Sequence, residues 1–307
     1  MYIVSCHLYY VNLFMKTPQQ FYPDLSRTLC IPEVYLKRED LHVFGSHKGR
    51  SIPIMMKEYL KKGQNQFAIS SSGNAAFSAG LFAKKHNQNN LENQIALDIY
   101  VGKKIGQEKY DRLASLVSSR IQLFQTERPK QQALQAMAEG KINLRQSTDD
   151  LALIGYHELA KELIKIPNLS AVFVPTSSGT TAQALAEACL LFTQKTQIHV
   201  VQTTACHPIV STMKNEQIPN SKSTSLASAI VDQVAHRKEK VLSAVKKTGG
   251  DGWIINEEEI KQAIELTLNS TGLKISPNSA LSVAGLRRAV ASGWSWQGAI
   301  VCLITGA

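Results

Sequence analysis

Short runs of β-branched residues alternate with amphipathic stretches from about residue 66 onward, and this alternation constrains the fold more than any other feature of the chain. The pattern is typical of βα units arranged around a mostly parallel sheet. Strands are expected at 66–70, 95–101 and 120–125, each followed by a stretch with helical periodicity. The sequence therefore predicts an α/β fold with open, mostly parallel sheets that carry helices on their faces.

The expected helices begin and end at residues with suitable capping chemistry. A helix rich in small residues is expected over 74–86 and another over 108–119. A third is expected over 129–140, because proline suits the first turn of a helix and glycine suits its end. A cluster of Ser, Thr and Asp opens a longer helix over 147–166. Further along the chain we expect strands at 171–175 and 198–204 and a helix at 181–194.

A chain of 307 residues is long enough for two lobes with separate cores. We predict a small domain over 61–149 and a large domain over 150–307, with residues 1–60 packing partly on the large one. Because Met15 is followed by Lys-Thr-Pro, a further hypothesis places the start of translation at that methionine.

The composition is that of a soluble globular protein, with 44% hydrophobic and 19% charged residues. A net charge of +10 would suit nucleic-acid binding if the basic residues were clustered, but here they form scattered pairs. We therefore expect no nucleic-acid partner, and the lack of a long apolar stretch predicts no membrane partner. The five cysteines are scattered without a C-x-x-C pair, which predicts reduced cytoplasmic thiols and no metal site.

Three turn sequences carry candidate chemistry, and the first contains Lys48. It reads GSHKGR, and it follows an expected strand and opens an expected helix. Burial and a helix N-terminus both disfavour a charged amine, so Lys48 could act as a nucleophile that forms a Schiff base. The alternative is a lysine on the surface, which the local sequence alone favours.

The second turn, SSSGNAA, lies between the expected strand at 66–70 and the helix at 74–86. The hydroxyls of Ser71 and Ser72 and the backbone N–H groups near Gly73 could hold a carboxylate, and Asn74 offers an amide. An ordinary capped turn is the alternative.

The third turn, PTSSGTTA, follows the expected strand at 171–175. Its hydroxyls, with close backbone approach at Gly179, could form a phosphate nest at a helix N-terminus. It is neither a Walker loop nor a dinucleotide fingerprint. Taken alone, this turn would be weak evidence for a phosphate site.

In these three turns the chain resembles fold-type II pyridoxal-phosphate-dependent enzymes, and within them the threonine synthases most closely. GSHKGR is similar to the G-S-F-K-D-R cofactor-lysine motif, SSGNAA to the S-G-N-T loop, and PTSSGTTA stands where the family has its phosphate turn. Weaker similarities follow in the same order to the end of the chain. The resemblance implies two αβα lobes like those of the tryptophan synthase β-chain, with pyridoxal 5′-phosphate in the cleft between a small substrate-binding and a large cofactor domain.

The resemblance also implies a role for each matching position. Lys48 would hold the cofactor covalently and later move the substrate's α-proton. The other cofactor-binding residues would be Asn74 at the 3′-oxygen, Thr176, Ser177, Ser178, Gly179 and Thr180 around the phosphate, and Thr305 at the pyridine nitrogen. The substrate-binding residues would be Ser71, Ser72 and Gly73 at the carboxylate, and Arg50 at an anionic leaving group.

The chain departs from the family's motifs at several positions. His47 and Gly49 stand where Phe and Asp are usual, and Ala75 replaces a Thr that often helps to bind the carboxylate. Ser276 replaces a Glu, and relatives continue past the last residue with His-Gly and a tail that closes the site. These differences leave open which reaction of the family the chain performs.

The resemblance implies a lyase that converts O-phosphohomoserine to threonine and phosphate, working as a cytoplasmic homodimer. A serine or threonine dehydratase and a β-replacing synthase are alternatives within the same fold. A binding module without catalysis is an alternative of another class. Two interpretations also stay open for Arg50, which could bind a phosphate or pair with Glu39 or Asp40, and His47 could be a plain helix-start residue or assist proton transfer.

Overall fold

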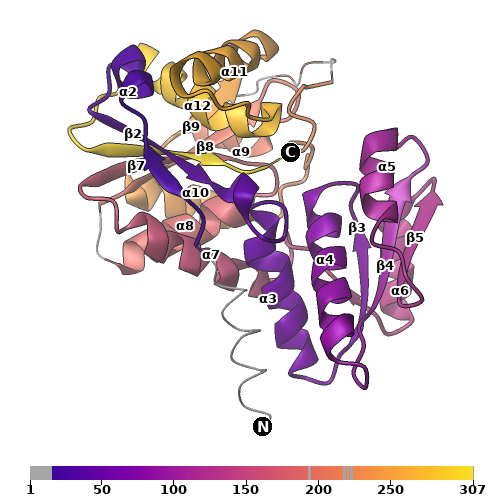
Figure 1. The fold of residues 1–307 in the computed structure, drawn as a ribbon. Helices are drawn as coiled ribbons and strands as arrows, with labels where there is room; N and C mark the ends of the chain where they lie inside the picture. Colours follow the sequence, from indigo (N-terminus) through magenta and orange to yellow (C-terminus); the bar gives the residue numbers. More distant parts are fainter. Residues whose placement is uncertain (1–15, 193–194, 217–218, 220, 222–223, 307) are drawn as a thin grey trace. The chain divides into compact units, whose positions relative to one another are not determined.

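The structure is a computed structural model that describes residues 16–192, 195–216, 219, 221 and 224–306 (Figure 1). The chain divides into two compact units, each described here by itself. Unit 1 contains His42–Gly155, and unit 2 contains Lys16–Leu41 and Tyr156–Ala307. The hypothesis about Met15 concerns residues outside the described part of the chain.

Unit 1 is built on a four-stranded, fully parallel sheet in the order β5-β4-β3-β6. Helix α4 covers one face, with α3 and α5 packed against it, and α6 covers the other face (Figure 1). The strands are β3 (Gln66–Ser70), β4 (Ala96–Gly102), β5 (Ile121–Thr126) and β6 (Ile142–Asn143). The helices are α3 (Lys48–Leu60), α4 (Asn74–Asn89), α5 (Gln107–Ala114) and α6 (Pro129–Ala138).

The central strands β3 and β4 are buried on both faces because helices cover both sides of the sheet. Phe67, Ile69 and Leu97 are examples of strand residues that are fully or almost fully buried. Helix α5 ends earlier than the expected 119, since Ser118 and Ile121 exchange backbone hydrogen bonds of 3.0 and 3.3 Å that close a tight turn.

Unit 2 is built on a six-stranded sheet in the order β1-β2-β10-β7-β8-β9. All neighbouring pairs are parallel except the edge pair of β1 and β2. The strands are β1 (Gln19–Phe21), β2 (Glu33–Arg38), β7 (Leu169–Pro175), β8 (Gln197–Thr203), β9 (Gly252–Ile255) and β10 (Ala299–Ile304). The helices are α2 (Pro23–Leu29), α8 (Thr180–Leu191), α9 (Pro208–Lys214), α10 (Lys238–Thr248), α11 (Glu257–Thr271) and α12 (Pro277–Ala291), with the 3-10 helix η1 (Glu39–Leu41).

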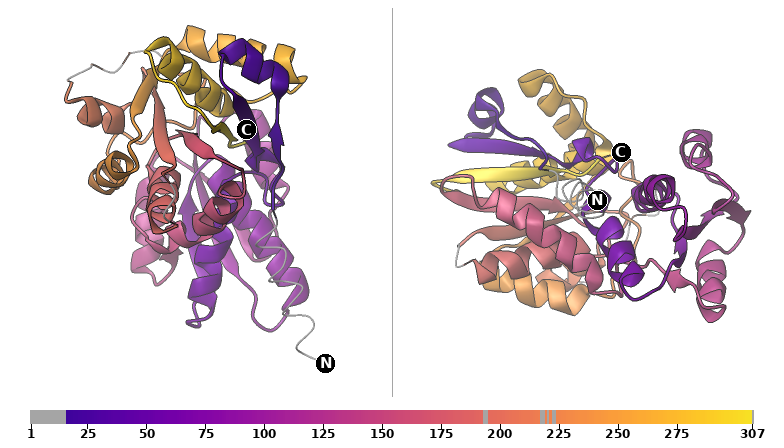
Figure 2. Two further views of the ribbon diagram at one scale, coloured as in Figure 1. Left: turned by 90° about the vertical axis from the view of Figure 1, so that its left-hand side faces the viewer. Right: turned by 60° about the horizontal axis from the view of Figure 1, so that its bottom comes forward.

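The helices of unit 2 lie on both faces of this sheet. Helices α8 and α10 pack together on one face, whereas α12 packs on the other and carries α11 (Figure 1). Helix α2 lies beside α11, as the turned views show (Figure 2). The core on the α12 side includes Phe173, Trp253 and Ile300.

Helix α7 (Leu151–Leu163) begins in unit 1 and ends in unit 2. It starts later than the expected 147 because the carboxylate of Asp149 accepts the backbone N–H of Leu151 at 2.9 Å. The cluster of Ser, Thr and Asp therefore precedes the helix, as an N-terminal cap does.

The predicted fold class, a mixed α/β protein with parallel sheets, is confirmed. Residues 16–41 belong to unit 2, while 42–60 belong to unit 1. The assignment of a substrate-binding and a cofactor domain, and of a cleft between them, stays a prediction. Within the described residues, Cys30, Cys189, Cys206 and Cys302 are free thiols. None of the described helices is long and apolar enough to cross a bilayer.

Candidate active site

The turn at 71–74 lies at the point in the unit 1 sheet where the strand order reverses. Strand β3 is followed by α4 and then by β4 on one side, whereas β6 pairs with its other side. Helix α4, which follows β3, and helix α6, which leads into β6, lie on opposite faces of the sheet. Ligands of open α/β sheets bind at such a switch point, beyond the carboxyl ends of the strands.

Lys48 is the first residue of α3, where the sequence placed it. The hydroxyl of Ser46 accepts its backbone N–H at 3.2 Å. Burial lowers the pKa of the Lys48 ammonium to about 8. An amine with this pKa has an appreciable uncharged fraction near neutral pH, as a nucleophile requires.

Gly49, which stands where the family has Asp, is fixed by packing within unit 1. A Cβ at this position would lie 2.2 Å from His42 Nδ1, a distance that no side chain can accept. The close approach of the loop before α3 therefore requires glycine.

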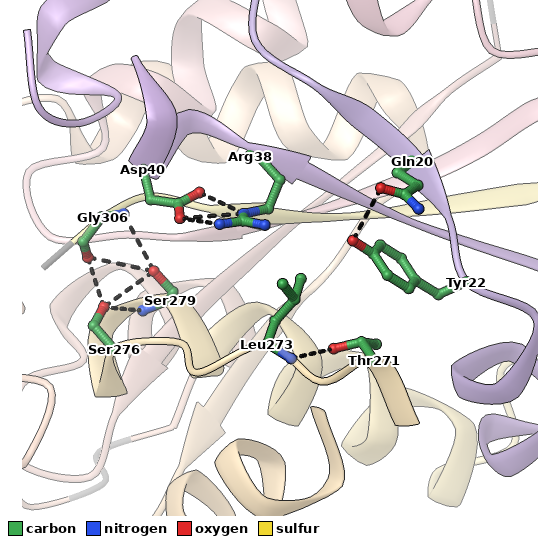
Figure 3. A network of polar contacts seen from close by, with 9 residues as sticks. All are labelled: Gln20, Tyr22, Arg38, Asp40, Thr271, Leu273, Ser276, Ser279 and Gly306. Atoms are coloured by element: carbon green, nitrogen blue, oxygen red, sulfur yellow. Dashed lines mark hydrogen bonds and ion pairs between the residues drawn. The ribbon is translucent and has the colours of Figure 1, made fainter. Parts of the chain in front are cut away.

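Arg50 is the third residue of α3 and is only 1% exposed. Its carbonyl oxygen is 1.6 Å from the place that a Cβ on Gly155 would occupy, so the two backbones touch. Asp40, one of the two carboxylates considered as its partner, is held by Arg38 through bonds of 2.9 Å from Nε and 2.7 Å from Nη2 (Figure 3). The binding of a leaving group by Arg50 stays a prediction.

The predicted carboxylate turn joins β3 to α4. Ser71 Oγ accepts the N–H of Gly73 at 3.2 Å, and Gly73 is the extended N-cap of α4. Asn74 is the first residue of this helix, and its Oδ1 accepts a hydrogen bond of 3.3 Å from Arg112 Nη1. Arg112 was not identified from the sequence, because it belongs to another helix and reaches Asn74 only through the packing of α5 on α4.

The unit 2 residues lie at the corresponding switch point of their own sheet. Strand β7 leads through α8 to β8 on one side and pairs with β10 on the other, and α8 and α12 cover opposite faces. Thr176 follows β7, and Thr305 follows β10. The parallel pairing of these two strands ends at Cys302 and Phe173, three residues before Thr305 and Thr176. The two threonines therefore follow neighbouring strands at the carboxyl end of the same sheet.

The turn after β7 has the features of a phosphate cradle. Gly179 is the N-cap of α8 in the left-handed conformation, with φ of 89°, and a Cβ there would lie 2.6 Å from Val241 Cγ2. Ser177 Oγ accepts the N–H groups of Val231 and Asp232 at 3.1 and 3.2 Å, which orients its own proton away from both. The helix N-terminus and these hydroxyls fit a phosphate group.

The remaining hydroxyls of this turn bond locally. Thr176 donates to the carbonyl oxygen of Val174 at 2.7 Å, and the hydroxyls of Ser178 and Thr180 lie 3.0 Å apart. An anion can accept only a hydroxyl proton; the proton of Thr176 is taken by Val174, whereas the contact between Ser178 and Thr180 uses one of their two protons.

Thr305 is 4% exposed, and the residue after it is held firmly. Ser276 donates to the carbonyl oxygen of Gly306 at 2.6 Å, and Ser279 accepts the Gly306 N–H at 3.2 Å (Figure 3). Ser276 also caps α12 by accepting the N–H of Ser279 at 3.3 Å. The serine that replaces the family's glutamate thus fixes the end of β10.

Arg237 is a second cation that the sequence did not single out. It is 3% exposed, it donates to Gln183 Oε1 at 3.1 Å, and its Cβ lies 3.6 Å from the Cβ position of Gly179. A buried guanidinium near the first turn of α8 adds positive charge to the phosphate cradle.

Comparisons with known proteins agree with this chemistry. Residues 12–306 match the family described as "Pyridoxal-phosphate dependent enzyme". The chain is 24% identical to a threonine synthase of Methanosarcina acetivorans, over 92% of this chain and 72% of that protein. It is 25% identical to the threonine synthase of Mycobacterium leprae, over 94% of this chain and 80% of that protein.

Among solved structures, the chain is similar in fold to a pyridoxal 5′-phosphate-dependent aspartate racemase, with a TM-score of 0.82 and 18% identity over 95% of this chain and 90% of that one. A threonine deaminase from Solanum lycopersicum superposes with a TM-score of 0.78 and 18% identity, over 99% of this chain and 85% of that one. At these identities the likeness concerns the fold alone.

Proposed function

Because this chain belongs to the family of pyridoxal-phosphate-dependent enzymes, we propose that it is a lyase of the threonine synthase type, which converts O-phosphohomoserine and water to threonine and phosphate. Relatives named threonine synthase along most of the chain support this choice of reaction. The cofactor of the family is pyridoxal phosphate, and when bound it supplies an electron sink for negative charge at the substrate's α-carbon.

The observation that supports the proposal is the position of two polar turns. The turn at 71–74 follows β3 in unit 1 and the turn at 176–180 follows β7 in unit 2, and the strand order reverses at each of these strands. Lys48 opens α3 in unit 1, and Thr305 follows β10 in unit 2. A chain that bound no ligand would have no need to place its polar turns there.

Each residue has a role that its own chemistry supports. The Lys48 amine, with its lowered pKa, holds the cofactor and moves the proton at the α-carbon. The cradle at 176–180 binds the cofactor phosphate. Thr305 offers a hydroxyl rather than a carboxylate to the pyridine nitrogen. Ser71 to Gly73 bind the α-carboxylate, and Asn74 presents its amide.

The orientation of Asn74 follows from its contact with Arg112. A guanidinium only donates hydrogen bonds, so the amide atom that faces it is Oδ1. The amide nitrogen of Asn74, which is a donor, then points away from Arg112. This orientation suits the cofactor's 3′-oxygen, which accepts hydrogen bonds.

The first experiment tests attachment of the cofactor. Purified protein is incubated with pyridoxal phosphate and borohydride, and the modified peptide is identified by mass spectrometry. We expect the label on Lys48 and its loss in Lys48→Ala, with Lys61→Ala as control, since Lys61 is an exposed partner of Glu58. Label on other lysines only, or none, would contradict the proposal and favour a binding module.

The second experiment tests the reaction. The loaded protein is given O-phosphohomoserine, threonine or serine, and released phosphate, threonine and keto acid are measured. The proposal requires phosphate and threonine from O-phosphohomoserine. Keto acid from threonine or serine without phosphate release would assign the chain to the dehydratases instead. Location in the cytoplasm and assembly as a homodimer stay predictions, the second of which sedimentation can test.

A further inference from the structure

Arg112 is a half-buried cation of unit 1 that forms no ion pair with any residue that the structure describes. Its guanidinium stacks on Phe77 at 3.8 Å from the ring centroid, and it donates to Asn74. Within the described part of the chain no carboxylate oxygen lies within 4.0 Å of it. Burial lowers the pKa of Arg112, and the more distant charge of Glu108 on the same helix offsets only part of this effect.

Its position links Arg112 to two of the turns that carry the candidate site. Asn74 lies directly after the turn at 71–73, and its bond to Arg112 brings the guanidinium to that turn. Gly45 lies three residues before Lys48, and a Cβ on it would be 3.0 Å from Arg112 Nη2. All of these residues belong to unit 1.

The hydrogen-bonding capacity of Arg112 exceeds what its neighbours use. A guanidinium carries five N–H donors in a planar fork that matches carboxylate or phosphate. One long bond of 3.3 Å to a neutral amide satisfies one of them. A partly desolvated cation without a counter-charge is unfavourable, so the arrangement is better explained by an anion that arrives from outside the chain.

We propose that Arg112 binds an anionic group on the side chain of the substrate, a phosphate or a carboxylate, and so selects amino acids that carry a second negative charge. The inference rests on the amino-acid chemistry proposed above and names the residue that would recognise the anionic end of the substrate. The α-carboxylate belongs to the turn at 71–73, where the N-terminus of α4 receives it. Arg112 then binds the anionic group at the end of the substrate's side chain.

The test compares ligands that differ in side-chain charge. Protein loaded with pyridoxal phosphate is titrated with O-phospho-L-serine and L-serine, and with L-aspartate and L-asparagine, and each Kd is read from the change in cofactor absorbance. We expect the wild type to bind the anionic member of each pair more tightly. In Arg112→Gln the Kd of the anionic members should rise about 10- to 100-fold, and that of the neutral members less than about threefold.

Two further variants keep the test informative. Arg120→Gln is the matched control, because Arg120 is exposed and precedes β5, at the amino end of the sheet. It should behave as the wild type. Arg112→Lys keeps the charge but loses the fork, so it should recover part of the preference for anionic ligands. Its recovery would separate charge recognition from damage to the packing on Phe77.

Three outcomes would overturn the inference. The wild type could show no preference for the anionic ligands. Arg112→Gln could weaken all four ligands equally, which would assign Arg112 to the α-carboxylate, or it could change none of them. The inference and the proposed reaction fail separately: a charge preference that depends on Arg112, without phosphate release from O-phosphohomoserine, would support the first and reject the second.

Discussion

The hydroxyl of Ser276 donates to the carbonyl oxygen of Gly306 at 2.6 Å while its oxygen caps the first turn of α12. One side chain thereby joins the start of α12 to Gly306 (Figure 3). Gly306 is the second residue after β10 and the chain neighbour of Thr305. A glutamate at this position in relatives would bring a charge, whereas the serine brings a fixed, neutral connection.

We expect Ser276→Ala to lower the free energy of unfolding by about 1 to 2 kcal/mol, because it removes both a helix cap and a part-buried hydrogen bond. It should also raise the Kd for pyridoxal phosphate, since Thr305 loses the neighbour that fixes it. Urea unfolding and cofactor titration measure the two effects. Ser292→Ala is the control: its exposed hydroxyl bonds only its own helix, and the change should cost less than about 0.5 kcal/mol.

Gly179 gives a second prediction, because it combines a left-handed φ of 89° with contact against Val241. Gly179→Ala should destabilise unit 2 by roughly 2 to 4 kcal/mol and weaken cofactor binding, since strain and overlap act together. Thermal unfolding and the Kd for pyridoxal phosphate are the measurements.

A glycine elsewhere in unit 2 separates these two causes. Gly272 has a φ of 72°, but nothing lies within 4 Å of its Cβ position. Gly272→Ala should cost only about 1 kcal/mol and leave cofactor binding unchanged. Equal effects of the two substitutions would show that the packing against Val241 does not matter.

The pKa of Lys48, lowered by burial to about 8, predicts the pH dependence of cofactor capture. Only the uncharged amine attacks an aldehyde, so the capture rate should rise roughly tenfold per pH unit up to pH 7 and level off above pH 8 to 9. Rapid-mixing absorbance measurements from pH 6 to 10 test this. N-α-acetyl-lysine in solution serves as the reference, and its rate should keep rising to about pH 10. A protein rate that follows the same course would contradict the burial of Lys48.

His199 predicts the acid sensitivity of unit 2. Its ring stacks on Phe173 at 4.5 Å, and Nδ1 accepts the indole N–H of Trp253 at 3.2 Å. Burial lowers its pKa to about 3 from the usual 6.5. Below pH 6.5 the unfolded chain binds a proton here that the native state does not, so stability falls as pH falls, by up to about 1.4 kcal/mol per pH unit.

Replacement of the ring by one that cannot titrate tests this. His199→Phe should be less stable than the wild type at pH 7, because Trp253 loses its acceptor, yet its stability should decline less steeply between pH 6 and pH 4. Urea unfolding across this range gives both slopes. His236→Phe, at an exposed position, should keep the slope of the wild type. Equal slopes for His199→Phe and the wild type would exclude a neutral buried histidine.

Much of the fold could be predicted from local sequence. Helices α4 and α6 begin at Asn74 and Pro129, as expected, because the start of a helix depends on residues that are adjacent in the sequence. The strands β3 and β8 were expected within one residue of their observed bounds, since apolar runs buried on both faces are distinctive. Lys48 likewise begins α3, as its turn sequence indicated.

The order of the strands could not be predicted in this way. Nothing near Ala299–Ile304 indicates that this strand pairs with Glu33–Arg38, because pairing between distant segments is decided by the whole core. For the same reason Arg112 and Ser279 could not be identified from the sequence. Their side chains reach the candidate site only through the packing of α5 and α12. The turns at 71–74 and 176–180 could be located because their sequence neighbours define them, whereas the roles of their residues stay predictions.

The insertion of β10 between β2 and β7 has a consequence for biosynthesis. Of the strands in the described residues, β10 leaves the ribosome last, yet it occupies the middle of its sheet. Until β10 joins the sheet, no strand lies between β2 and β7. The carboxyl end of the sheet, where the turn at 176–180 lies, is then incomplete. Unit 1, whose strands are all contiguous in the chain, can assemble during translation. The turn at 176–180 should therefore gain its complete sheet later than unit 1 gains its own, once β10 has joined β2 and β7.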